Sequence, residues 1–203
     1  MLLGSCCLVC GAPAVACCSS CEAQLAGRQP HRLLRRRLRI PAWAANSYRP
    51  ELMRLIPAFK DDGAWLLARL LSHRLAVAVA ACQPPSHAVL VPVPSRPAAV
   101  RRRGIDHMWT LARLAARSLG IRAFRLLWRL DGGDAQHTQG RSGREQLVAA
   151  SFRSRPCPHP VILVDDVATT GTSLAVTQEV LQDRGVLVLA AAVIGDANLM
   201  GTR

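Results

Sequence analysis

Apolar residues occur in this chain in two patterns, short continuous runs and helically spaced stretches. Three short runs are apolar at nearly every position, which is typical of parallel strands covered on both faces; they are 88–94, 161–164 and 186–194, and 124–130 is a fourth candidate strand. Helical spacing predicts helices over 51–60, 63–81, the stretch between Asp106 and Gly120, and 172–184. Helices that alternate with buried strands predict an α/β fold with three layers and a mostly parallel sheet.

Two acids, Asp165 and Asp166, follow the apolar run 161–164 directly. In open α/β sheets, ligands bind at the carboxyl ends of the strands, so these carboxylates would lie at the ligand edge. A pair of carboxylates at this edge can accept hydrogen bonds from a sugar diol or hold a magnesium ion.

The next residues form a turn rich in hydroxyl groups; they are Ala168, Thr169, Thr170, Gly171, Thr172 and Ser173. Gly171 permits a tight turn, and the helix that follows directs free N–H groups and its positive dipole end at an anion. The spacing of a Walker loop is missing, which predicts a site for one phosphate rather than a triphosphate. An ordinary Asp turn with a Ser/Thr N-cap would explain one acid and one hydroxyl, but not the whole set.

A second group of polar residues follows the apolar run 88–94. Ser95 and Arg96 leave this run, and Arg103 with Gly104 ends a short arginine-rich loop. Guanidinium groups bind phosphate oxygens in bidentate fashion, and a loop at the carboxyl end of a parallel strand lies on the same edge as the two acids. We therefore expect a diphosphate subsite here; the alternative is a cluster of arginines on the surface.

The cysteines are concentrated at the start of the chain. Cys7 and Cys10 form one C-x2-C pair, and Cys18 and Cys21 form another seven residues later. Four thiolates at this spacing predict a closed, structural zinc site, which would also stabilise a segment too short to have its own core. The neighbouring thiols of Cys6 and Cys17 are alternative ligands for Cys7 and Cys18, and disulfides or free thiols are the alternative to zinc.

The strongly positive net charge of the chain indicates an anionic binding partner. The chain of 203 residues has a net charge of +13, and Lys60 is its only lysine. Phosphorylated substrates and DNA both fit this charge, although a genome rich in G+C also raises the arginine content. The arginines of 28–39 predict a basic helix that either contacts a phosphate backbone or is simply solvated. A site that needs a compact ammonium would explain Lys60, so we add it to the diphosphate group, with chance as the alternative.

We expect a cytoplasmic protein without a membrane span. The start of the chain lacks the basic segment and the apolar core of a signal peptide. The most hydrophobic helical run, 64–81, is interrupted by Arg69, His73 and Arg74. The polar, glycine-rich stretch 131–146 has the composition of a lid over a site, or of a connection without function.

The stretch from Val161 to Ser173 resembles the phosphoribosyl pyrophosphate signature of type I phosphoribosyltransferases. Taken with the other motifs, the chain resembles the ComF family of competence-associated, phosphoribosyltransferase-like proteins over nearly its whole length. The motifs occur in that family's order: Cys7 to Cys21, Lys60 with Gly63, Pro92-Val93-Pro94 with Arg103-Gly104, Gln139 with Arg144, and Asp165 to Gly171.

The resemblance implies a type I phosphoribosyltransferase fold with an amino-terminal zinc knuckle. It divides the chain into the knuckle (1–27), a basic helix and linker (28–50) and the phosphoribosyltransferase-like domain (51–203). It further implies that Asp165 and Asp166 hold the ribose of phosphoribosyl pyrophosphate or ribose 5-phosphate, with magnesium, and that 168–173 hold its 5′-phosphate. Ser95, Arg96, Arg103 and Lys60 would then bind the pyrophosphate.

The chain departs from the family pattern at two places. It has Ile105-Asp106-His107 where the family has an aromatic residue and Asn-Gln, and Arg144-Glu-Gln-Leu147 where the family has Arg-x-x-Asn. Both changes weaken the case for transfer to an acceptor and leave the sugar phosphate pocket intact. The alternative function is a non-catalytic, nucleic-acid-associated protein of DNA uptake or recombination that retains the phosphate pocket. The acceptor and the oligomeric state cannot be predicted from these residues.

Overall fold

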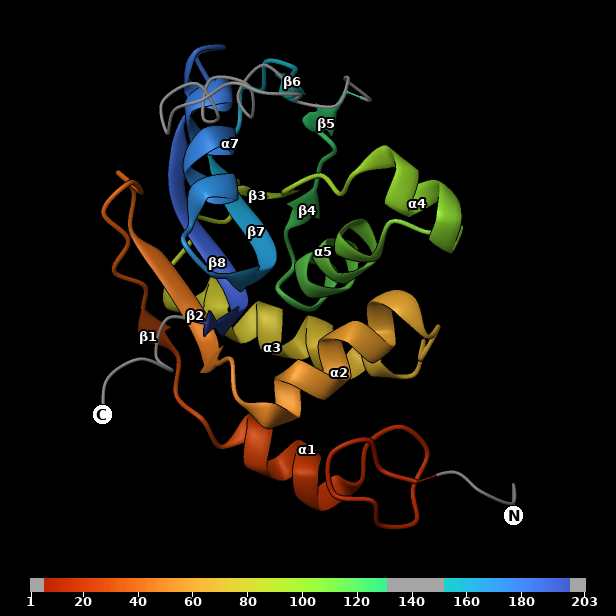
Figure 1. The fold of residues 1–203 in the computed structure, drawn as a ribbon. Helices are drawn as coiled ribbons and strands as arrows, with labels where there is room; N and C mark the ends of the chain where they lie inside the picture. The colour runs from red at the N-terminus through yellow and green to blue at the C-terminus, as the bar shows by residue number, and fades with distance from the viewer. Residues whose placement is uncertain (1–5, 131–151, 198–203) are drawn as a thin grey trace.

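The computed structural model describes residues 6–130 and 152–197. Its main sheet has six strands in the order β1-β2-β8-β7-β3-β4 (Figure 1). The strands are β1 (His31–Arg32), β2 (Ala42–Ser47), β3 (Val89–Pro92), β4 (Arg122–Ala123), β7 (Val161–Ala168) and β8 (Val188–Asp196). All neighbouring strands pair in parallel except β1 and β2, which are antiparallel. The predicted α/β fold with a mostly parallel sheet is therefore confirmed.

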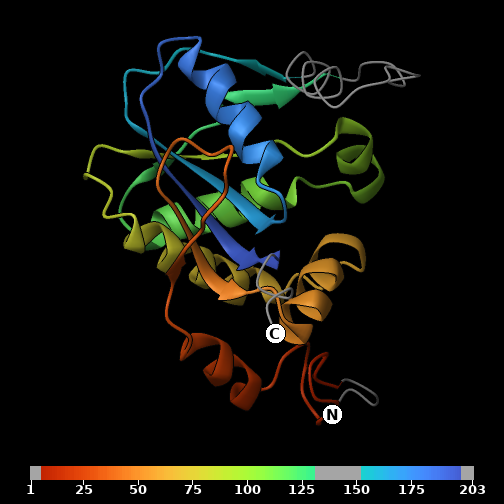
Figure 2. The same ribbon diagram turned by 60° about the vertical axis from the view of Figure 1, so that its left-hand side comes forward.

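Helices cover both faces of this sheet. On one face lie α2 (Pro50–Asp61), α3 (Leu67–Ala81) and α5 (His107–Ser118), and on the other lies α7 (Thr172–Gln182) (Figures 1 and 2). Successive side chains of a strand point to opposite faces. Ile162 and Val164 accordingly pack with the first group of helices, while Val161 and Leu163 pack on the side of α7.

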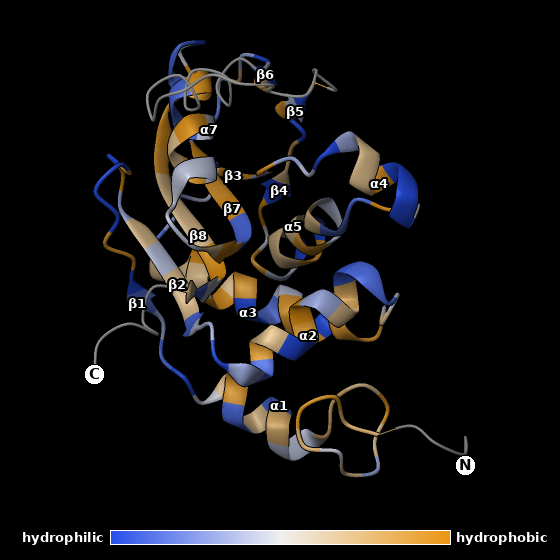
Figure 3. Ribbon diagram, viewed as in Figure 1, coloured by the Kyte–Doolittle hydropathy of each residue, from blue (hydrophilic) through white to orange (hydrophobic). Residues whose placement is uncertain are grey.

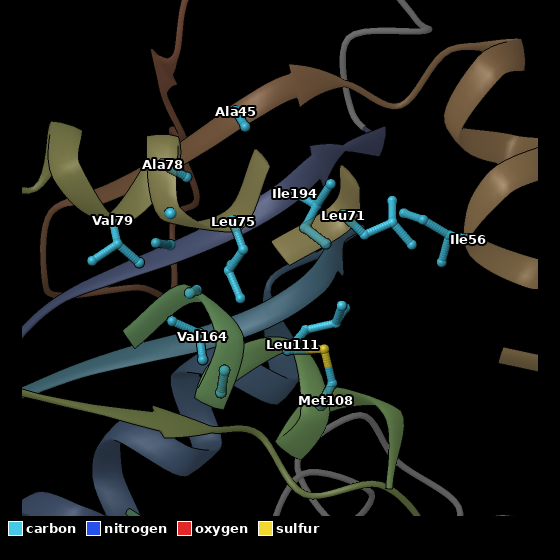
Figure 4. Close-up of a cluster of buried hydrophobic side chains, with 14 of the residues drawn as sticks. Ala45, Ile56, Leu71, Leu75, Ala78, Val79, Met108, Leu111, Val164 and Ile194 are labelled. Atoms are coloured by element: carbon cyan, nitrogen blue, oxygen red, sulfur yellow. The ribbon is translucent and has the colours of Figure 1, made fainter. Parts of the chain in front are cut away.

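The hydrophobic core on the face covered by α3 and α5 contains side chains of both helices and of the strands beneath them. Leu75 of α3 and Leu111 of α5 lie over Val164 of β7 and Ile194 of β8 (Figure 4), and all four side chains are fully buried. The apolar character of β3 and β7 contrasts with the hydrophilic carboxyl end of α4 (Pro97–Arg103), which carries three consecutive arginines (Figure 3). The continuous apolar runs of the sequence thus correspond to strands buried on both faces.

Of the candidate strand at 124–130, only Leu127–Arg129 forms a strand, and it does not belong to the main sheet. β4 ends at Ala123, and the N–H of Phe124 still donates to the carbonyl of Leu90 in β3. The chain then leaves the main sheet, and β5 (Leu127–Arg129) pairs with β6 (Phe152–Ser154) in a separate antiparallel sheet. The stretch expected to be a lid, 131–146, lies outside the described residues.

The predicted basic helix over 28–39 is wrong. This segment contains β1 and an irregular turn, and Leu33 is buried whereas Leu34 is 82% exposed. Adjacent residues on opposite sides are a feature of extended chain, because a helix would place them on neighbouring positions of its surface. The N–H of Leu33 donates to the carbonyl of Ala42, so this part of the segment pairs alongside β2 instead of forming a helix.

The amino-terminal segment is fastened to the main sheet by a buried guanidinium. Arg74 of α3 donates to the carbonyls of Ala26, Arg28 and Ala45 and to the side chain of Asn46. Ala26 ends α1 (Ser19–Ala26), and Ala45 and Asn46 belong to β2. β2, within the linker expected at 28–50, is thus an integral strand of the main sheet.

None of the helices in the described part of the chain combines the length and apolar character that a membrane span requires.

Candidate functional site

The turn between β7 and α7 forms an open pocket at the carboxyl edge of the sheet. Together with the open solvent at its mouth it has an empty volume of about 240 Å³, and it is lined by Asp165, Val167 and the residues 168–174. Gly171 has φ +75°, in the left-handed region that glycine adopts without strain, and α7 begins at Thr172. The hydroxyls of Thr170 and Thr172 lie 2.9 Å apart, so the polar groups predicted for the turn converge at one place.

Asp166 is held by two basic side chains from other parts of the chain. Lys60 of α2 forms an ion pair with its Oδ2, and Nε2 of His107, the first residue of α5, lies 3.1 Å from the same oxygen. Burial alone would raise the pKa of Asp166, but the hydrogen bond from His107 and the charge of Lys60 hold it at about 2. Asp166 is therefore ionised and internally neutralised.

Asp165 has a different environment although it is the adjacent residue. It lines the pocket, and its Oδ1 accepts a hydrogen bond from the backbone N–H of Asp166. Burial and the charge of Asp166 raise the pKa of Asp165 to about 8. Because like charges this close disfavour double ionisation, the pair is a single anion near neutral pH, with the negative charge on Asp166.

The predicted diphosphate residues are only partly brought together. Lys60 lies at the acid pair, through Asp166. Arg103, at the end of α4, instead binds Asp61 at the end of α2, with its Nε 2.8 Å from Oδ1 of Asp61. Ser95 and Arg96 lie between β3 and α4, and the Arg96 side chain is exposed. Burial and the positive charge of Arg96 lower the pKa of Arg129, which places these two cations near each other.

The four cysteines predicted to bind metal do come together. The Sγ atoms of Cys7, Cys10, Cys18 and Cys21 all lie within 4.8 Å of one another, and none of them forms a disulfide. Sγ of Cys10 and Sγ of Cys18 are 3.7 Å apart, close to the distance of about 3.8 Å that four sulfurs at zinc bond length require in a tetrahedron. This cluster could hold a metal such as zinc, and neither Cys6 nor Cys17 belongs to it.

Backbone N–H groups also favour a thiolate in this cluster. The N–H of Cys18 donates to Sγ of Cys7 at 3.3 Å. Burial by itself would raise the pKa of Cys7, but hydrogen bonds from the backbone of Cys10, Cys18 and Val9 lower it to about 6. Metal ligands must be deprotonated thiols, so Cys7 suits coordination, whereas burial raises the pKa of Cys21 and a metal ion would have to displace its proton.

Arg35, predicted as part of a DNA-binding helix, points inward to the pocket turn instead. Its guanidinium donates to the carbonyls of Thr169 (2.8 Å) and Ala168 (3.2 Å) and forms an ion pair with Asp196, the last residue of β8. Its side chain is only 6% exposed. Arg35 is therefore unavailable to a phosphate backbone, whereas Arg36 and Arg39 are exposed.

Sequence reasoning missed three residues around the pocket: His107, Arg35 and Asp196. His107 followed a capping residue, Asp106, whose side chain accepts from the N–H of Trp109, and nothing in the local pattern pointed to Asp166. Asp196 ends an apolar strand just as Asp165 and Asp166 do, and this position was a usable signal. Arg35 gave no signal, because its partners lie far along the chain.

No protein-family model matches the chain, and no curated protein matches it. Solved structures that resemble it include an orotate phosphoribosyltransferase from Aeropyrum pernix (22% identity, 70% of this chain and 64% of that chain, TM-score 0.39). They also include adenine phosphoribosyltransferases from Saccharomyces cerevisiae (13%, 90% and 92%, TM-score 0.43) and Thermoanaerobacter pseudethanolicus (12%, 70% and 86%, TM-score 0.39).

The chain spans 64% of the length of the orotate phosphoribosyltransferase. These TM-scores are below 0.5, so the function has to be inferred from the residues of this chain.

Proposed function

We propose that this protein binds a ribose that carries a 5′-phosphate, as phosphoribosyl pyrophosphate or ribose 5-phosphate, in the pocket between β7 and α7. The observation that carries the proposal is the convergence of a carboxyl group and a hydroxyl-rich turn on one strand end. Asp165 and the residues 168–174 line the same pocket, and α7 begins inside it. A phosphate at the start of α7 would meet free N–H groups, threonine hydroxyls and the positive end of the helix dipole.

The ribose hydroxyls would then lie against Asp165. Asp166 is bound to Lys60 and His107, so its carboxylate is not free for the sugar. Its role would be to keep a negative charge next to Asp165, while its two partners hold the end of β7 in position. This separates the two acids, which we had expected to act together on the sugar. With its raised pKa, the carboxyl group of Asp165 is protonated near neutral pH, so it donates a hydrogen bond through its O–H and accepts one through its other oxygen, and it can bind both hydroxyls of a diol.

The acid pair does not fit a preformed magnesium site. Oδ2 of Asp166 is occupied by two basic groups, and the raised pKa of Asp165 disfavours its ionised form. Magnesium commonly binds proteins through one or two carboxylates together with substrate phosphates. A magnesium ion would therefore arrive bound to the diphosphate of the ligand.

Transfer of the phosphoribosyl group is the reaction that this pocket suits. The bond between the anomeric carbon and the diphosphate oxygen breaks, the diphosphate leaves with the electron pair, and an acceptor atom forms the new bond. Positive charge develops on the ribose meanwhile and favours loss of the Asp165 proton, so that the resulting carboxylate stabilises that charge. Arg96 is the exposed guanidinium at the end of β3 that would bind the leaving diphosphate; Arg103 would first have to release Asp61.

The four-cysteine cluster is proposed to hold one structural zinc ion. The residues fit the ion, because four sulfurs lie at tetrahedral spacing and the cluster consists of thiols only. A four-thiolate shell has no open position for a substrate, so the metal would serve folding and not the reaction.

The second candidate is a non-catalytic protein that senses the ligand and contacts DNA. The exposed Arg32, Arg36 and Arg39 on the segment 28–39 favour it, because a row of solvated guanidinium groups attracts a phosphate backbone. Release of pyrophosphate separates the two functions, since a sensor binds the ligand without consuming it.

The test combines calorimetry with a pyrophosphate assay. Wild-type protein should bind ribose 5-phosphate, and with magnesium and a nucleobase mixture it should release pyrophosphate from phosphoribosyl pyrophosphate. Asp165→Ala removes both hydrogen-bonding atoms of the carboxyl group and should weaken binding by about 1 to 3 kcal/mol. Asp62→Ala, at an exposed aspartate, is the matched control. Absence of ligand binding by the wild type overturns the proposal, and binding without pyrophosphate release selects the sensor.

A further inference from the structure

The peptide groups of the pocket turn are held from behind by a side chain that is distant in sequence. The carbonyls of Ala168 and Thr169 both accept hydrogen bonds from Arg35. The described part of the chain contains no cis peptide bond. In a trans peptide the C=O and N–H groups point in opposite directions. The N–H groups of Thr169 and Thr170, which belong to the same two peptide units, therefore point away from Arg35.

These N–H groups are left for a ligand. Within the described residues, the N–H groups of Thr169, Thr170 and Gly171 donate to no backbone carbonyl. The N–H of Thr172 has only a long contact, 3.4 Å, to the hydroxyl of Thr170. Thr169 and Thr170 are exposed, so their N–H groups are open to solvent, and several N–H groups on a concave turn form an anion site.

Gly171 shows that the approach of Arg35 is built into the turn. A Cβ atom at position 171 would lie 3.0 Å from Cγ and 3.3 Å from Cβ of Arg35. The left-handed φ of +75° and this close approach both require glycine here. The stem of Arg35 thus packs on the turn while its guanidinium binds the preceding carbonyls.

Asp196 keeps the Arg35 side chain in place. It is 3% exposed, it ends β8 beside Ala168, and it forms an ion pair with Arg35. His31 of β1 lies 3.3 Å from its other carboxylate oxygen. Nη2 of Arg35 thus donates both to this buried carboxylate and to the carbonyl of Ala168, while Nε donates to the carbonyl of Thr169.

We propose that Arg35 is a positioning residue for the phosphate pocket: it turns the peptide groups after Ala168 and Thr169 so that their N–H groups face the 5′-phosphate. This inference rests on the proposed function for the identity of the ligand, but the orientation of the turn is independent of it. Arg35 does not touch the ligand, and it places its positive charge behind a site for an anion.

Two conservative variants and one control test this role. Arg35→Gln loses the charge and the fork of donors, and Arg35→Lys keeps the charge for Asp196 but cannot reach both carbonyls at once. Arg184→Gln is the control, because Arg184 is an exposed arginine at the opposite end of α7 and its loss changes the net charge equally. Each protein is titrated with ribose 5-phosphate and with inorganic phosphate, and the amide signals of Thr169 and Thr170 are followed by NMR.

We expect Arg35→Gln to bind ribose 5-phosphate about tenfold more weakly than the wild type, and to shift or broaden both amide signals. The affinity of Arg35→Lys for ribose 5-phosphate should lie between those of Arg35→Gln and the wild type, and this variant should unfold at nearly the same urea concentration as the wild type. Arg184→Gln should bind the ligand as the wild type does. Arg35→Lys decides the question if Arg35→Gln fails to fold.

The outcomes separate the two proposals. If the folded Arg35 variants retain wild-type affinity or unchanged amide signals, the positioning role is wrong. If the wild type binds neither ligand while the amide signals still depend on Arg35, the proposed function fails and the positioning role stands.

Discussion

Lys60 and Asp166 form an ion pair that joins α2, in the helical layer, to the strand end beside the pocket. The only lysine of the chain thus neutralises an acid whose side chain is just 9% exposed. The pairing explains why Asp166 stays ionised while its neighbour Asp165 does not. Lys60 therefore takes part in setting the charge of the pocket, and its direct contact with diphosphate stays a prediction.

Replacement of Lys60 by Met should lower the free energy of unfolding at pH 7 by about 1 to 3 kcal/mol, because Asp166 then keeps only His107 as a partner. The depressed pKa of Asp166 contributes stability above pH 4 that is lost as the pH falls towards 2. The difference in unfolding free energy between Lys60→Met and the wild type should therefore be smaller at pH 3 than at pH 7. Urea unfolding at both pH values measures this difference. The double variant Lys60→Met/Asp166→Asn completes a double-mutant cycle for the pair. Equal stability of Lys60→Met and the wild type at pH 7 would contradict the pairing.

Asp165→Asn should stabilise the protein at alkaline pH. The pKa of Asp165 is raised to about 8, so the folded chain holds a proton that the unfolded chain releases near pH 4. Stability contributed by that proton is complete below pH 4 and is lost as the pH rises through 8. The asparagine variant has no such proton to lose, so its free energy of unfolding at pH 9 should exceed that of the wild type by on the order of 1 to 3 kcal/mol. Thermal unfolding of both proteins at pH 5 and 9 checks this. The same difference in stability between Asp165→Asn and the wild type at the two pH values would refute it.

Metal content should follow the four-cysteine cluster and no other thiol. The purified protein should carry about one equivalent of zinc, and Cys10→Ser should lose it and unfold more easily. Cys6→Ser is the matched control, because Cys6 adjoins the cluster but does not belong to it. Elemental analysis and unfolding with and without a chelator give the answer. Full zinc retention by Cys10→Ser would sink the assignment.

DNA binding, if the protein has it, should be independent of sequence and should weaken steeply with salt. Arg36→Glu/Arg39→Glu should reduce it, because both side chains are exposed on the segment 28–39. Arg35→Glu is not a suitable probe, since Arg35 holds the pocket turn and its ion pair with Asp196 would become a repulsion. Fluorescence anisotropy at two salt concentrations makes the comparison. An unchanged affinity in the Arg36/Arg39 variant would remove this segment as the contact.

Much of the fold could be predicted because its central strands are buried on both faces. Such strands are continuous apolar runs, and β3, β7 and β8 were found in this way. β2 was missed because its sequence, Ala-Trp-Ala-Ala-Asn-Ser, has small and polar residues that fit a helix or a loop equally well. The segment 28–39 was misread because its alternating arginines and leucines imitate an amphipathic helix, whereas the pairing of Leu33 with Ala42 determines its shape.

The pocket itself is local in sequence, and this made it predictable. Asp165 and 168–173 are consecutive along one strand and turn, so their spacing alone brings them together. The residues that set the charge and the orientation of the pocket come from elsewhere: Lys60, His107 and Arg35. A single sequence contains no signal for such tertiary contacts, because each of these residues is locally plausible as a solvated side chain.

Arg74 is a cation with 1% exposure and no carboxylate partner within the described residues, and backbone carbonyls and the Asn46 side chain satisfy it instead. Burial and the charge of Arg28 lower its pKa. Two of these carbonyls belong to Ala26 and Arg28, just where a boundary between knuckle and body would be drawn. Excising residues 1–27 would remove the Ala26 carbonyl and leave this buried guanidinium short of one acceptor. The amino-terminal module thus supplies part of the polar environment that a charge of α3 needs inside the fold.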